Sequence, residues 1–208
     1  MKNNVNFQQK LDEKLAKITK EQITPSLLLH ACCAPCSSYC LEYLSGFFNI
    51  TIYYYNPNIS LREEFDKRVN ELSRLIKEMP LVHPVQLVIG EHHPEDFFAM
   101  AKGLEDVPEG GERCYKCYEQ RLLATAKMCK EQKFDYFTTT LSISPYKRAD
   151  WLNEIGGRLA QEYGLEYLYS DFKKKNGYKR SIELSQEYHL YRQNYCGCVY
   201  SQREIEEF

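Results

Sequence analysis

The 208-residue sequence predicts an α/β fold, Rossmann-like, in which a parallel sheet carries helices on both faces. Two observations support this prediction. Short apolar runs alternate with amphipathic helical segments, which is the order of βαβ units. The apolar runs show no polar alternation, as expected for strands that are covered on both faces. In such sheets a ligand binds beyond the carboxyl ends of the strands.

The first helix is expected at residues 7–22, where Leu11, Leu15 and Ile18 recur at helical spacing. The predicted strands share a short apolar pattern and are residues 26–30, 50–55, 85–89, 134–141 and 165–169. The other predicted helices show the longer amphipathic period and are residues 35–46, 61–79, 94–103, 117–132, 150–163 and 181–191. We expect an N-terminal helical extension, 1–25, followed by a single domain, 26–208.

Charge and composition exclude several classes of protein. The net charge is −2, so a nucleic-acid site would have to be a local patch rather than a global basic surface. No apolar run approaches the ~20 residues of a membrane span, and the polar start lacks the apolar core of a secretory signal. We therefore expect a cytoplasmic protein. Nine cysteines in that reducing compartment favour metal or redox chemistry over a disulfide framework.

Two cysteine pairs have the spacing of metal ligands. The stretch LLLHACCAPCSSYC places Cys32 and Cys33 directly after the first predicted strand, and GERCYKCYEQR contains Cys114 and Cys117. A spacing of three residues directs both sulfurs of the second pair to one side of a helix start or turn. Such pairs bind zinc or iron–sulfur clusters, and two pairs supply the four thiolates of a 4Fe–4S cluster.

Other residues near these pairs have simpler explanations. Cys40 and Cys129 are expected to be ordinary buried thiols, because free cysteine is among the most buried residue types. The pattern does not decide whether Cys36 is a ligand. His30, at the end of the first strand, is a ligand, a proton donor or a hydrogen-bonded core histidine, the last being the default.

A third cysteine motif, Cys196-Gly197-Cys198, lies near the end of the chain. A disulfide across three residues closes a strained ring, and glycine permits the unusual backbone angles that this ring needs. Strained disulfides are easily reduced, which suits a catalytic redox pair. The alternatives are thiolate ligands of a second mononuclear metal, iron or zinc, and two incidental cysteines.

Four segments together resemble the epoxyqueuosine reductases of the QueH family: HACCAPC, RCYKCYEQR, TTTLSISPYK and RSIELSQEYHLYRQNYCGC. The resemblance covers about residues 26–203. It implies an oxidoreductase that reduces the epoxide of epoxyqueuosine at the tRNA wobble position, the last step of queuosine biosynthesis. It further implies a 4Fe–4S cluster and a redox-active pair, with these residues in order: Cys32, Cys33, Cys114 and Cys117 for the cluster, and Cys196 and Cys198 for the pair.

The fold implied by the resemblance is related to the nucleotide alpha-hydrolase-like families, which include ATP-dependent tRNA-thiolating enzymes. The first loop here reads HACCAPCSS rather than their SGGxDS phosphate loop, so ATP use is not expected. The implied reaction also needs an external electron donor.

A tRNA substrate requires cations that contact phosphates. The stretches SPYKR and DFKKKNGYKRS supply the candidate contacts Lys147, Arg148, Lys174, Lys175 and Arg180. The alternative for such stretches is a solvated loop. Candidate aromatic residues for stacking on an extruded base are Tyr146, Tyr178 and Tyr195.

Two rival functions remain open at this point. One is a zinc-stabilised tRNA-binding module without redox chemistry, which would be colourless where an iron–sulfur protein is brown. The other is an ATP-dependent tRNA sulfur transferase, against which the missing phosphate loop argues.

Overall fold

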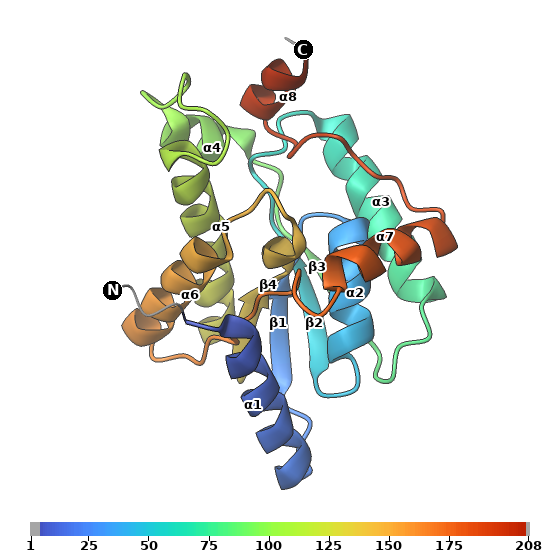
Figure 1. The fold of residues 1–208 in the computed structure, drawn as a ribbon. Coiled ribbons are helices and arrows are strands. Elements are labelled where there is room, and N and C mark those ends of the chain that lie inside the picture. Colours follow the sequence, from blue (N-terminus) through green and yellow to red (C-terminus); the bar gives the residue numbers. More distant parts are fainter. Residues whose placement is uncertain (1–4, 207–208) are drawn as a thin grey trace.

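The computed structural model describes residues 5–206, and the side chains as far as residue 202 (Figure 1). Four parallel strands form one sheet in the order β3-β2-β1-β4. Their bounds are Ser26–His30 for β1, Asn49–Tyr54 for β2, Gln86–Ile89 for β3 and Tyr136–Thr139 for β4. The chain leaves β1 toward β3 on one side and returns to β4 on the other. The topological switch point therefore lies between β1 and β4.

Helices cover both faces of this sheet, which confirms the predicted α/β class (Figure 1). In Figure 1, α2, α3 and α7 lie on one side of the sheet, and α5 and α6 lie on the other. The helix bounds are Phe7–Glu21 (α1), Ala34–Leu44 (α2), Arg62–Glu78 (α3), Pro94–Ala101 (α4), Glu112–Gln132 (α5), Ala149–Tyr163 (α6), Gly177–Glu187 (α7) and Val199–Glu206 (α8). None of the described helices is both long and apolar enough to span a bilayer.

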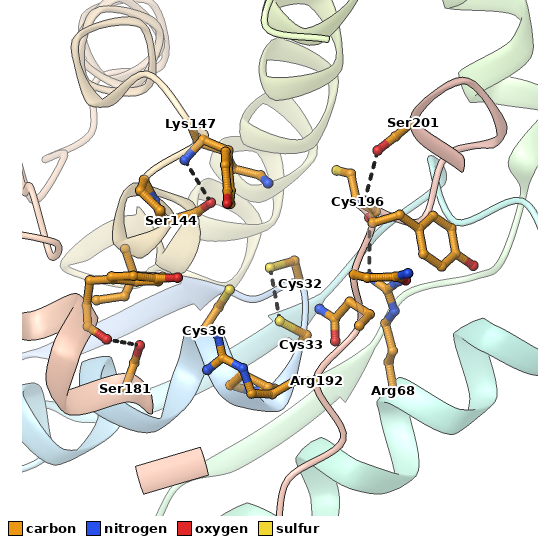
Figure 2. Close-up of a pocket in the computed structure, with 18 of the residues that line it drawn as sticks. Cys32, Cys33, Cys36, Arg68, Ser144, Lys147, Ser181, Arg192, Cys196 and Ser201 are labelled. Carbon is orange, nitrogen blue, oxygen red and sulfur yellow. Dashed lines mark hydrogen bonds between the residues drawn. The ribbon is translucent and has the colours of Figure 1, made fainter. Parts of the chain in front are cut away.

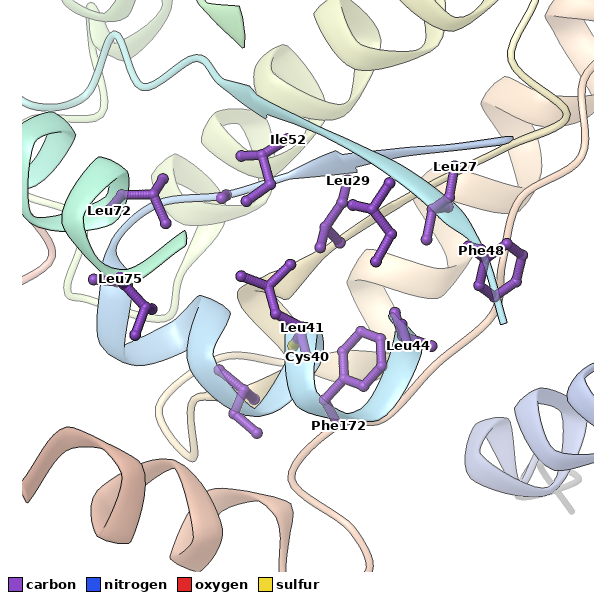
Figure 3. Close-up of a cluster of buried hydrophobic side chains, with 14 of the residues drawn as sticks. Leu27, Leu29, Cys40, Leu41, Leu44, Phe48, Ile52, Leu72, Leu75 and Phe172 are labelled. Atoms are coloured by element: carbon purple, nitrogen blue, oxygen red, sulfur yellow. The ribbon is translucent and has the colours of Figure 1, made fainter. Parts of the chain in front are cut away.

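The leucines of β1 show why the sheet needs two helical layers. Leu27 and Leu29 belong to one hydrophobic cluster with residues of α1, α2 and α3 (Figure 3). Leu28 points the other way and belongs to a second cluster with residues of α5 and α6. This alternation is the two-residue period of a strand, and all three side chains are fully buried. An apolar run without polar alternation therefore becomes the central strand.

The N-terminal helix α1 is part of this core. Leu11, Leu15 and Ile18 are buried in the larger cluster, and Tyr43 Oη of α2 donates a hydrogen bond to Asp12 at 3.1 Å. The extension therefore covers apolar surface next to α2. The division of the chain into an extension and one domain remains a prediction.

The predicted fifth strand, 165–169, is wrong as an element. Only one isolated bridge forms, between Phe137 and Tyr167. Beyond it, side chains replace the ladder: Ser170 N donates to Asn153 Oδ1 at 2.9 Å, and Phe172 N donates to the Ser142 hydroxyl at 3.2 Å. Within the segment itself, the bridge to β4 carries two backbone hydrogen bonds, from Phe137 N to Glu166 O at 3.1 Å and from Leu168 N to Phe137 O at 3.0 Å, and only the residues after it rely on side chains.

Most other elements differ from prediction by one or two residues at their ends, and a few differ by more. Strand β4 ends at Thr139, whose hydroxyl accepts from Leu141 N and starts a 3-10 turn, Thr140–Ile143. Helix α5 begins at Glu112 rather than residue 117, and α7 covers Gly177–Glu187 rather than 181–191. Helix α8 was not predicted. The early start of α5 matters for function, because it places both cysteines of the second pair on the helix.

Candidate metal and redox site

A cavity of about 250 Å³ lies at the carboxyl ends of β1 and β4, where the switch point predicts a ligand. Figure 2 shows its lining: Arg68, Glu109 and Ser201 contribute, but most of it comes from four segments far apart in the sequence. They are the loop and first turn after β1, the loop after the 3-10 turn, the start of α7, and the tail before α8.

Three cysteine sulfurs form a compact group in this cavity (Figure 2). The Sγ atoms of Cys32, Cys33 and Cys36 all lie within 4.8 Å of one another, and Cys32 and Cys33 are 3.6 Å apart. Cys33 caps the N-terminus of α2 in an extended conformation, so the first turn of that helix brings Cys36 back toward the pair. Hydrogen bonds with Cys32 and Cys36 lower the pKa of Cys33. This trio has the donor set of a metal site, and it includes the cysteine that the sequence left undecided.

Cys114 and Cys117 lie on the first two turns of α5. Cys117 is buried, and that burial raises its pKa to about 11. Cys114 accepts a hydrogen bond from Gly110 N at 3.3 Å and packs against the hydrophobic cluster that contains Cys32 and Cys33. Among the described residues, neither belongs to the 4.8 Å sulfur group. The two predicted pairs thus share one region, but this pair is not within metal-ligand distance of the trio.

The Cys196-Gly197-Cys198 turn is docked on the segment that follows β2. Arg68 Nη1 and Asn58 Nδ2 both donate to Cys196 O, at 3.2 and 3.3 Å. Ser60 N donates to Gly197 O at 3.2 Å. Gly197 has φ +104°, a conformation that other residues rarely adopt, and an added Cβ would lie 2.8 Å from a carbon of Ile59.

Ser201, on the first turn of α8, closes the other side of this turn. Its hydroxyl accepts from Cys196 N at 3.3 Å and donates to Glu109 at 2.9 Å, while its backbone N–H donates to Cys198 Sγ at 3.4 Å. Burial raises the pKa of Cys198 to about 12. Both cysteines of the turn are free thiols. Figure 2 shows Cys196 on the opposite side of the cavity from Cys36, with Cys32 between them.

Two buried arginines stand next to these sulfurs with incomplete hydrogen bonding. Arg121 is 1% exposed, and neither of its Nη atoms has a partner in the described structure. Arg68 is 2% exposed; its Nε donates to Glu64 at 2.7 Å, but its Nη2 has no partner among the described residues either. Buried cations are unfavourable unless an anion compensates them. A metal–thiolate group carries negative charge, so the residues present fit such a group.

Lys147 and Arg148 are neighbours with different surroundings. Lys147 is half-buried and lines the cavity. Burial opposes its charge, but the nearby sulfurs, Cys196 first among them, raise its pKa overall. Arg148 is exposed, forms an ion pair with Asp150 and lies over the ring of Trp151 at 4.2 Å.

The other predicted RNA contacts lie around the start of α7, whose first turns line the cavity through Tyr178 and Ser181. Lys174 is exposed. Lys175 pairs with Asp12 at 2.7 Å, and Arg180 pairs with three glutamates, Glu42 at 2.6 Å being the closest. Of the three candidate stacking residues, Tyr146 is the most open, at 79% exposure on the rim of the cavity.

The simpler explanations hold for three residues. Cys40 and Cys129 are fully buried in the two hydrophobic clusters, as expected of packing thiols. His30 contacts Tyr55 O through Nε2 at 3.0 Å and the Thr139 hydroxyl through Nδ1 at 2.8 Å. A carbonyl only accepts, so Nε2 carries the proton. Both ring nitrogens are occupied, as in a core histidine.

Sequence reasoning missed the residues that surround the sulfurs. Arg121 follows Cys117 by four residues, a spacing that places both on one face of a helix, so a signal existed. Arg68 and Asn58 carry no comparable signal. They reach Cys196 across 128 and 138 residues of chain, which only the folded structure reveals.

Known proteins are similar to this chain over most of its length. The family model of epoxyqueuosine reductase QueH matches residues 27–204. The chain is 42% identical to the Streptococcus pyogenes serotype M1 protein named epoxyqueuosine reductase QueH, over 95% of this chain and 81% of that relative. It is 31% identical to the Thermotoga maritima protein of the same name, over 88% of this chain and 93% of that relative. These matches favour the reductase over the zinc module and the sulfur transferase. The chain therefore belongs to the epoxyqueuosine reductase QueH family.

Proposed function

We propose that this chain is an oxidoreductase that converts epoxyqueuosine at the wobble position of tRNA into queuosine. The reaction breaks both C–O bonds of the epoxide and leaves a carbon–carbon double bond. Two electrons and two protons are consumed, and the oxygen leaves as water. The observation that carries the proposal is the family match over residues 27–204, which includes every cysteine around the cavity.

For the cofactor, the proposal is a 4Fe–4S cluster held by Cys32, Cys33, Cys114 and Cys117. Four thiolates are the usual ligand number of such a cluster. The packing of Cys114 against the cluster of residues around Cys32 and Cys33 supports this set, as do the unpartnered buried arginines. Cys36 is the alternative ligand, because its sulfur already lies next to the first pair. When bound, a 4Fe–4S cluster supplies electrons one at a time.

The thiols of Cys196 and Cys198 are proposed as a redox pair. Their oxidation to a disulfide releases two electrons and two protons, which equals what the epoxide consumes. An external electron donor then has to reduce the disulfide. The rival assignment, in which these thiolates bind a second mononuclear metal, iron or zinc, predicts instead that their loss removes one metal ion per chain.

Lys147 is the residue best placed to act on the substrate oxygen. It lines the cavity, and its raised pKa keeps it an ammonium at neutral pH. A fixed positive charge in a partly dehydrated site stabilises the alkoxide that develops when the first C–O bond breaks. At about 250 Å³ the cavity is smaller than the ~300–1,000 Å³ of drug-sized ligand pockets, which suits a single ring rather than a nucleotide.

The tRNA is proposed to approach over the start of α7 and the 146–148 loop. Lys174 is exposed there, whereas Arg148, Lys175 and Arg180 are paired with carboxylates of this chain. Surface ion pairs of this kind are worth only ~0–1 kcal/mol, so phosphates can replace the carboxylates.

The direct test uses protein reconstituted anaerobically with iron and sulfide, a chemical reductant, and tRNA that contains epoxyqueuosine. Nucleosides from digested tRNA are then identified by mass spectrometry. Queuosine is the expected product, and a Cys129→Ala protein should behave like wild type, because that thiol is buried in the core. Iron-loaded wild-type protein that leaves epoxyqueuosine unchanged would contradict the proposal.

A further inference from the structure

Arg121 differs from another buried arginine on the same helix. Arg113 is 2% exposed, and its Nη1 donates to three backbone carbonyls of the loop before α5. Arg121 is 1% exposed, but only its Nε is engaged, donating to Cys117 O at 3.2 Å. Its two Nη atoms have no hydrogen-bond partner, and no carboxylate of the described side chains forms an ion pair with it. Within the part of the chain whose side chains are described, a cation is thus buried on α5 without an anion to pair with it.

The titratable groups that act most strongly on this guanidinium are mostly thiols. Its strongest electrostatic neighbours are Cys117, Cys196 and Cys32, which come from α5, the tail turn and the loop after β1. The ring of Tyr118 lies 5.7 Å from the guanidinium carbon. His30, also close enough to be affected, is neutral with both ring nitrogens hydrogen-bonded, so it offers no negative charge.

Protonated thiols cannot balance a buried guanidinium. Thiols lose their protons when they bind a metal, so metal binding creates the missing negative charge beside Arg121. The same positive charge favours the more negative, reduced state of a bound cluster, because it lowers the energy of an added electron.

We propose that Arg121 is the counter-charge of the metal–thiolate group, which retains that group and raises its reduction potential. Arg121 does not line the cavity, so it acts as a positioning residue through the sulfurs rather than on the substrate. This inference rests on the proposed iron–sulfur cofactor.

The primary test is the midpoint potential of the cluster in anaerobically reconstituted protein, followed by electron paramagnetic resonance during a redox titration. Arg121→Met should shift the potential to a more negative value, and Arg121→Lys should keep it near that of wild type. Arg158→Met is the control for lost positive charge, because Arg158 is 46% exposed and pairs with Glu119 at the surface. It should leave the potential unchanged. An unshifted potential in Arg121→Met would overturn the proposal.

If the Arg121→Met protein binds no cluster, its midpoint potential cannot be measured, and a second measurement is used. The melting temperatures of metal-free wild type and metal-free Arg121→Met are then compared. Because the change removes an uncompensated buried charge, the variant should melt no lower than wild type. A clear drop would show that Arg121 supports the fold itself, which contradicts the proposal. Wild-type protein that binds no iron contradicts the cofactor as well, whereas iron binding with an unshifted potential contradicts only the inference about Arg121.

Discussion

The two ends of helix α2 place the same residue type in two different environments. Cys33 at the N-terminal end is 1% exposed, and Cys40, seven residues later, is 0% exposed, so burial does not separate them. Cys40 lies among leucines and phenylalanines (Figure 3). Cys33 contacts another thiol at 3.6 Å and lies near the buried cation of Arg68. Cys33 differs from Cys40 because it lies at the carboxyl edge of the sheet, next to another thiol and a buried charge. We therefore assign a chemical role to Cys33 and a packing role to Cys40.

The largest expected effect is loss of the metal from the N-terminal end. Cys33→Ala should lower metal affinity by more than ~100-fold, because even residues that only support metal ligands contribute 10–100-fold. Iron and acid-labile sulfide per chain, measured after anaerobic reconstitution, report this directly. Wild-type iron content in this variant would remove the distinction between the two ends of the helix.

The next largest effect is expected on turnover, when the two cysteines of the Cys196-Gly197-Cys198 turn are replaced. A Cys196→Ser, Cys198→Ser protein should keep its cluster and still bind tRNA, yet leave epoxyqueuosine unconverted. Mass spectrometry of nucleosides gives the conversion, and the absorption spectrum gives the cluster. Normal turnover would refute the redox pair. Loss of one metal ion per chain would instead assign these thiolates to a second metal.

The tail turn also depends on Gly197. Gly197→Ala should cost about 1–3 kcal/mol in the free energy of unfolding, because φ is +104° and the new Cβ would lie 2.8 Å from Ile59. Turnover should fall as well, since the turn positions both thiols. Gly164→Ala is the matched control: φ is +68°, but no atom lies within 4 Å of an added Cβ. It should lose stability, measured by urea unfolding, and keep turnover. Equal turnover in the two variants would contradict the docked turn.

A smaller effect is expected at the proposed RNA surface. Changing Lys174 and Lys175 to Ala should weaken tRNA binding and lower the slope of log affinity against log salt by up to about 2, because fewer counterions are released. The control changes Lys17 and Lys20 to Ala. Both lie at the C-terminal end of α1, just before β1 begins, and so at the amino edge of the sheet rather than at the cavity. Equal slopes in both double variants, measured by a salt series, would show that residues 173–180 are a solvated surface without a role in RNA binding.

The smallest effect is expected at the apolar end of α2. Cys40→Ala should lower the free energy of unfolding by about 1 kcal/mol, comparable to removal of one buried methyl group. Iron content and turnover should match wild type. A loss of iron here would show that the two ends of the helix are not chemically distinct.

The sequence predicted the elements whose pattern is local. The four strands and most helices follow from apolar runs and helical periodicity, and the cysteine pairs follow from their spacing at predicted strand ends. The fifth strand is reduced to one bridge with β4, because the side chains of Asn153 and Ser142 bind the backbone N–H groups of Ser170 and Phe172 directly after it. No pattern in residues 165–169 records those distant partners.

The surroundings of the site were less predictable for the same reason. Cys36 joins the pair before it because Cys33 caps α2, a backbone detail that the sequence does not specify. Arg68 and Asn58 reach the tail turn only after β2, α3 and the tail have packed together. Lys147 is another example: its place in the lining of the cavity, beside the thiols, could not be predicted from the sequence, and its contact with RNA stays a prediction.

The central claim is that this chain binds a 4Fe–4S cluster. Its most direct test is the metal and sulfide content of anaerobically purified wild-type protein, together with its absorption spectrum. The account predicts a brown protein with about four iron and four sulfide per chain, bleached on reduction. Any further metal would be bound at the tail thiols. A colourless protein that contains zinc and no sulfide, and that nevertheless converts epoxyqueuosine to queuosine, would contradict it.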